Sequence, residues 1–145
     1  MDEEFDKLKT KVLKYIVYKK RTEREVLQKF FEEDGNLLNE VIEYLKEAEY
    51  LNDNLYIDKA VKDFINLNNL SVKEIEYKLT SKGLKRSLIS DYIYNNREML
   101  VEYELNSAEK IVAKKKNNYD VEELKAYLSK KGYMPDIIKT ALEKY

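Results

Sequence analysis

Short clusters of basic residues are the side chains in this sequence whose chemistry is easiest to state. Lysine and arginine cations bind phosphates and carboxylates, so a recurring series of clusters indicates contact with a nucleic-acid backbone or an acidic protein surface. Cations also stabilise the C-terminal ends of helices, and that simpler interpretation stays open for each cluster. The candidate partner-binding residues are Lys82, Lys85, Arg86, Lys114, Lys115, Lys116, Lys130 and Lys131.

Aromatic residues are the second group able to contact a partner, because the chain has 13 Tyr. A tyrosine ring stacks on unpaired bases or anchors a protein interface. The alternative is that the rings border hydrophobic cores while their hydroxyls reach water. Tyrosines in helical phase with apolar residues favour this alternative, and they are Tyr15, Tyr44, Tyr56, Tyr92 and Tyr127.

Catalytic chemistry has few candidate residues. The sequence contains no His and no Cys, which excludes the commonest general base, thiol nucleophiles, disulfides and the usual zinc ligands. Glycine-rich phosphate loops, metalloprotease motifs and nucleophile elbows are also absent. We therefore expect a binding protein that is not an enzyme, with no metal and no cofactor.

Overall composition favours a small helical protein. The 145 residues include 27 Lys plus Arg, 28 Asp plus Glu, three Gly and one Pro, for a net charge of −1. Few turn-forming residues and many charges suit solvent-exposed helices. No apolar stretch is long enough to cross a membrane, and the acidic start lacks the pattern of a signal peptide. We expect a cytoplasmic monomer without membrane contact.

A helix-start motif recurs three times along the chain. In a capping box, Ser, Thr or Asp accepts a hydrogen bond from an early helix amide while Glu three residues later reaches back to the capping residue. Such a pair occurs every 49 residues, as Thr22/Glu25, Ser71/Glu74 and Asp120/Glu123. A fixed period of this size predicts repeated helical units.

The residues around each motif predict three helices per unit. A longer apolar pattern precedes each capping box, as in 5–18, 54–68 and 97–116. Gly35, Gly83 and Gly132 follow the boxes, and we expect each glycine to close a helix with a positive φ. Pro135, the one proline of the sequence, is expected in the first turn of the last helix. The prediction is an all-α fold of three tandem three-helix repeats, about nine helices in an elongated curved body, with units at 1–50, 51–96 and 97–145.

Ordered motifs spread over almost the whole chain identify a family resemblance. They are Arg21-Thr22-Glu23-x-Glu25, Val41–Leu45 followed by Tyr50-Leu51-Asn52-Asp53, then Tyr56, Ala60 and Phe64, Ser71-x-x-Glu74-Ile75-x-x-x-Leu79-x-x-Lys82-Gly83-Leu84, Ala113-x-Lys115-Lys116, Leu124-x-x-Tyr127-Leu128-x-x-x-Gly132-Tyr133, and Ile137-Ile138. With these motifs the chain resembles the RecX family, regulators of the RecA recombinase.

The resemblance implies a regulatory role in homologous recombination, DNA repair and the SOS response. It implies a protein that binds the RecA–single-stranded DNA filament along its groove and inhibits RecA ATPase, strand exchange and coprotease activity. Contact with single-stranded DNA is then indirect or weak. Two other interpretations stay open: a helical protein that binds DNA directly through helix-turn-helix pairs, and a general helical-repeat scaffold for protein interactions.

Overall fold

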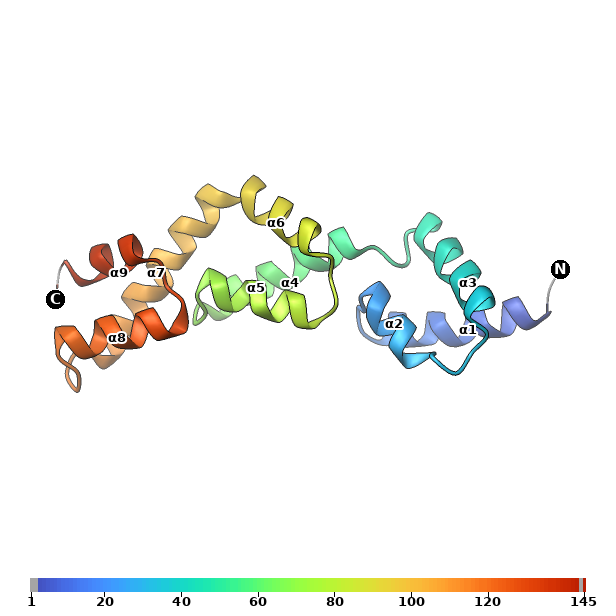
Figure 1. The fold of residues 1–145 in the computed structure, drawn as a ribbon, viewed down its shortest axis with the longest axis horizontal. Coiled ribbons are helices and arrows are strands. Elements are labelled where there is room, and N and C mark those ends of the chain that lie inside the picture. Colours follow the sequence, from blue (N-terminus) through green and yellow to red (C-terminus); the bar gives the residue numbers. More distant parts are fainter. Residues whose placement is uncertain (1–2, 144) are drawn as a thin grey trace.

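The computed structural model describes residues 3–143 and 145, and within them helices joined by turns are the regular secondary structure, without strands. Figure 1 shows an elongated, bowed arrangement with the first and last helices at opposite ends. The predicted fold class is confirmed. The nine helices in this part of the chain are α1 (Glu3–Tyr18), α2 (Glu23–Lys29), α3 (Gly35–Glu47), α4 (Asp53–Leu67), α5 (Val72–Ser81), α6 (Arg86–Asn95), α7 (Arg97–Lys115), α8 (Val121–Lys131) and α9 (Pro135–Leu142).

Three separate hydrophobic cores follow one another along the molecule. The first joins α1, α2 and α3 around Val12, Val26 and Val41, and the third joins α7, α8 and α9 around Leu124. The second joins α4, α5 and α6, and it also takes in Tyr103 from α7. Helix α7 therefore packs in two cores, which couples the last two units through one continuous helix.

All three predicted capping boxes form. In each, the side chain of the capping residue accepts a hydrogen bond from the third helical amide, and the glutamate accepts one from the capping residue's own amide. Pro135 is the first residue of α9, as the first-turn preference predicts. Local sequence signals are therefore sufficient to fix where α2, α5, α8 and α9 begin.

Two of the three glycines close helices as predicted, and one does not. Gly83 and Gly132 have φ of 82° and 96°, in the region that favours glycine. Gly35 is instead the first residue of α3. The prediction for Gly35 is wrong because Asp34 immediately before it accepts hydrogen bonds from two early amides of α3, at residues 36 and 37, and starts the next helix there.

Helix length and hydropathy bear on the expectation that the chain does not cross a membrane. Among the residues that the structure describes, no helix combines the length and apolar character needed to cross a membrane.

Candidate interaction surface

Successive units are joined by the same hydrogen bond at two places. Thr22 Oγ1 donates to the Lys82 carbonyl at 2.8 Å, and Ser71 Oγ donates to the Lys131 carbonyl at 2.7 Å. Both hydroxyls are fully buried, and each also accepts a hydrogen bond from the third amide of its own helix. Each capping hydroxyl thus starts a helix in one unit and holds the glycine turn of the next unit.

An ion pair accompanies each of these bonds. Lys82 Nζ lies 3.4 Å from a carboxylate oxygen of Glu25, and Lys131 Nζ lies 3.8 Å from one of Glu74. Lys131 Nζ also lies 3.4 Å from the Asn69 carbonyl oxygen. Two of the candidate partner-binding lysines therefore serve the contact between units, because their ammonium groups face acids of the preceding unit.

A carboxylate from the following unit completes each contact. Asp53 Oδ1 accepts the Glu23 amide at 3.0 Å, and Glu104 Oε1 accepts the Val72 amide at 2.9 Å. Burial raises the pKa of both carboxyl groups, although the bonds from backbone amides oppose that rise. The repeat period did not reveal this pair, because residues 53 and 104 are 51 positions apart while the capping boxes are 49 apart.

The glycine turns fit tightly against the preceding unit. A Cβ atom on Gly83 would overlap the Arg24 side chain. One on Gly132 would lie 2.9 Å from Lys73 Cβ and 3.3 Å from Ser71 Oγ. We call this set of contacts a junction: the capping hydroxyl, the ion pair, the carboxylate and the glycine turn. The residues that the structure describes form it twice.

The other candidate residues are distributed over separate places. Lys85 and Arg86 are exposed at the start of α6. Lys114 and Lys116 are exposed at the end of α7, while the Lys115 ammonium lies 4.7 Å from the centre of the Tyr127 ring.

Helix α8 separates the lysines at the end of α7 from Lys130 and Lys131. It has 11 residues, which corresponds to about 16 Å at the usual rise per residue. Figure 1 shows the end of α7 and the end of α8 at opposite ends of α8. The structure therefore places the basic candidates in several patches along the strip.

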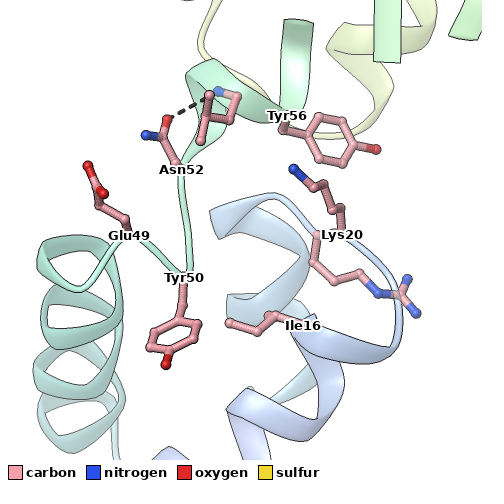
Figure 2. A pocket seen from close by; sticks show the side chains of 8 residues that line it. Ile16, Lys20, Glu49, Tyr50, Asn52 and Tyr56 are labelled. Carbon is pink, nitrogen blue, oxygen red and sulfur yellow. Dashed lines mark hydrogen bonds between the residues drawn. The ribbon is translucent and has the colours of Figure 1, made fainter. Parts of the chain in front are cut away.

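A further basic hollow lies between the first two units. Figure 2 shows Lys20, from the turn after α1, reaching toward Tyr56 of α4. Lys19, Lys20, Tyr56 and Lys59 line a neighbouring hollow of about 350 Å³. The candidate partner-binding residues do not include Lys19 and Lys20, although these two form a basic cluster with Arg21 in the sequence.

Arg21 in the same cluster has a different role. Its guanidinium carbon lies 4.3 Å from the centre of the Tyr15 ring, and one of its nitrogens lies 3.8 Å from a Glu25 carboxylate oxygen. This arginine joins the end of α1 to the first junction.

Two tyrosines that sequence reasoning missed are buried inside the molecule. The Tyr103 hydroxyl donates to the Leu70 carbonyl at 2.7 Å, and the Tyr133 hydroxyl lies 2.6 Å from Ser107 Oγ. Burial raises the pKa of both hydroxyls. They were missed because their hydrogen-bond partners lie 26 or more residues away in sequence. Of the tyrosines expected at core borders, Tyr15, Tyr56, Tyr92 and Tyr127 pack against cores, whereas Tyr44 is exposed.

Comparison with known proteins gives the family. No protein-family model matches the sequence. The regulatory protein RecX of Clostridioides difficile is 30% identical to this chain, over 99% of the chain and 70% of that relative. This chain belongs to the RecX family. The regulatory protein RecX of Finegoldia magna is 32% identical over 88% of the chain and 66% of that protein.

Solved RecX structures share the fold. The crystal structure of RecX from Lactobacillus salivarius superimposes with a TM-score of 0.81, at 24% identity, covering 99% of this chain and 97% of that one. A second crystal structure of a regulatory protein RecX gives a TM-score of 0.79 at 20% identity. Some RecX relatives are longer, and the chain spans about half the length of the one from Staphylococcus carnosus, 51%.

Proposed function

We propose that this RecX chain binds the RecA–single-stranded DNA filament and inhibits RecA ATP hydrolysis, strand exchange and coprotease activity. Membership of a regulatory protein family and the motif resemblance described above support this proposal. In the proposal the chain acts as a monomer in the cytoplasm, and it meets single-stranded DNA only indirectly or weakly.

The single observation that carries the proposal is the repeated junction. Thr22 with Lys82 and Ser71 with Lys131 make the same bond one unit apart, at 2.8 and 2.7 Å. A fixed step between units suits a partner that itself repeats, such as a filament of identical subunits. Several weak contacts on one stiff body then strengthen one another through effective concentration.

The proposed contact residues divide into two groups. Those with exposed side chains are free to meet a partner directly: Lys85, Arg86, Lys114, Lys116 and Lys130. Lys82, Lys115 and Lys131 are partly buried and have partners within the molecule. We propose that the first group contacts the filament and that the second group holds the surface in shape.

The test replaces the two exposed lysines at the end of α7. We expect Lys114→Ala/Lys116→Ala to weaken inhibition of RecA ATP hydrolysis about tenfold in half-inhibitory concentration, since two charge contacts are lost together. The control replaces two exposed lysines outside the clusters, Lys7 and Lys139. Equal inhibition by the two double variants would remove these lysines from the contact surface.

Two further measurements, DNA binding and a pull-down, separate the two alternative functions. A helical protein that binds DNA directly would bind naked DNA with a steep salt dependence and leave RecA unaffected. A general interaction scaffold would recover partners in a pull-down but never RecA.

A further inference from the structure

The second junction borders a groove with a distinctive set of side chains. The groove lies between α5 and α8 and encloses about 470 Å³. Lys73, Tyr77 and Lys78 line it from α5, and Lys130 and Lys131 line it from the end of α8. The Tyr77 side chain is 75% exposed, so its ring is available to a partner.

Most of the positive charge in this groove is uncompensated. Lys131 pairs with Glu74, which also lines the groove. Among the residues that the structure describes, Lys73, Lys78 and Lys130 form no ion pair, and the Tyr77 ring makes no ring or cation contact. Three unpaired lysines and one exposed ring therefore line the same hollow.

The first junction provides an internal comparison. Its groove encloses about 530 Å³ between α2 and the turn around Gly83. There Gln28 is the equivalent of Tyr77, because the two residues are one repeat period of 49 positions apart. Glu23 and Asp53 in the first groove offset the charges of Arg24 and Lys85. Phe31 supplies an exposed ring in the first groove too, but the charges there balance. Because the same junction forms without excess charge, packing between units does not explain the excess of lysines beside the ring of the second groove.

These features fit one kind of occupant best. A single nucleic-acid strand combines phosphates, which lysines bind, with unpaired bases, which stack on an exposed ring. An acidic protein segment would use the lysines, but its acidic side chains do not stack on a ring as unpaired bases do.

We infer that the groove between α5 and α8 binds a short stretch of single-stranded DNA. In this arrangement a base stacks on Tyr77, and neighbouring phosphates contact Lys73, Lys78 and Lys130. The inference rests on the proposed function for the source of the strand, and it assigns the weak DNA contact to one place.

The test measures binding of a labelled oligothymidylate of about 15 nucleotides by fluorescence anisotropy. We expect Tyr77→Ala to raise the Kd about tenfold through loss of stacking, while Tyr77→Phe stays within about twofold. The matched control is Gln28→Ala, the counterpart in the first groove, which should bind like the parent chain. Tyr77 is exposed, so these variants are expected to fold, and circular dichroism checks that they do.

A salt series tests the lysines separately. Lys73→Gln/Lys78→Gln/Lys130→Gln should reduce the slope of log Kd against log salt by about 2, since each lost phosphate contact on a single strand contributes about 0.7. Unchanged binding by both this variant and Tyr77→Ala would overturn the inference. Poly-glutamate binding that depends equally on Tyr77 would also overturn it, in favour of an acidic protein partner.

RecA ATP hydrolysis, measured on the same samples, separates this inference from the proposed function. If the parent chain binds the oligonucleotide through Tyr77 but leaves RecA unaffected, the groove is supported and the proposed function fails. If the chain inhibits RecA while both Tyr77→Ala and the triple lysine variant bind the oligonucleotide like the parent, the groove assignment fails and the proposed function is supported.

Discussion

At the scale of single residues, the two capping hydroxyls have a double role that the third capping residue lacks. Thr22 and Ser71 each accept a helix amide and donate to a carbonyl of the next unit. The Asp120 carboxylate accepts a hydrogen bond from the Glu123 amide, and a carboxylate is an acceptor only. A hydroxyl is therefore required where a junction forms, whereas either side chain suffices to start the helix.

Exchanging these residues tests that distinction. Ser71→Asp keeps a capping group but removes the donor and faces the partly buried Lys131 carbonyl with a negative charge, so we expect it to lower the free energy of unfolding by about 2–3 kcal/mol. Asp120→Ser keeps the cap and should change the free energy of unfolding by less than about 0.5 kcal/mol. Urea denaturation measures both, and equal effects would show that the junction bond adds no stability.

Glu104 gives a second prediction at this scale, concerning pH. Its side chain is buried, and burial raises its pKa above the ordinary 4.5. The folded chain therefore holds this proton more tightly than the unfolded chain, so the contribution of Glu104 to stability is largest at acidic pH and falls as pH rises above about 4.5.

Glu104→Gln removes the titration but keeps an oxygen to accept the Val72 amide. We expect the stability of the parent chain relative to Glu104→Gln to decrease between pH 4.5 and neutrality. Urea denaturation at a series of pH values measures this difference, and a constant difference would contradict the assigned pKa direction.

At the scale of helices and turns, glycine matters where it closes one helix against another unit. Gly83 and Gly132 have positive φ and lie against Arg24 and Lys73, whereas Gly35 has open space around it. Alanine at Gly83 or Gly132 should therefore lower the free energy of unfolding by about 1–3 kcal/mol. Alanine at Gly35, the first residue of α3, should raise the free energy of unfolding by less than about 1 kcal/mol. Thermal denaturation checks this order, which would be contradicted if all three variants behaved alike.

Helix starts are the part of the fold that the sequence predicts best. The capping boxes at Thr22, Ser71 and Asp120 depend on residues three apart, and all three form. Gly35 was misassigned because its neighbour Asp34 caps the following helix, a choice between two local signals.

The junctions could be predicted only in part. The 49-residue period aligns the glycine turns and capping boxes, but it does not state that Ser71 donates to Lys131, because 60 residues separate them. Lys82 was predicted as a partner-binding residue from local charge alone, and the structure pairs it with Glu25 of the first unit. Long-range pairings of this kind depend on how the units stack, which local composition does not specify.

At the scale of the whole molecule, two matching junctions and the shared helix α7 hold three small cores in a bowed strip (Figure 1). None of the cores is large, so contact between neighbouring units contributes much of the stability, as in other repeat proteins. The strip presents basic residues at several places along its length, which suits a long partner better than a compact ligand.

The most direct test of this account is the rate of RecA ATP hydrolysis on single-stranded DNA while the chain is titrated at several salt concentrations. We predict that the parent chain slows hydrolysis, most strongly at low salt, and that Asp120→Ser does the same. Ser71→Asp, which loosens the second junction, should require about tenfold more protein because its contacts no longer act together. A hydrolysis rate that stays constant at every concentration of the parent chain would contradict the account.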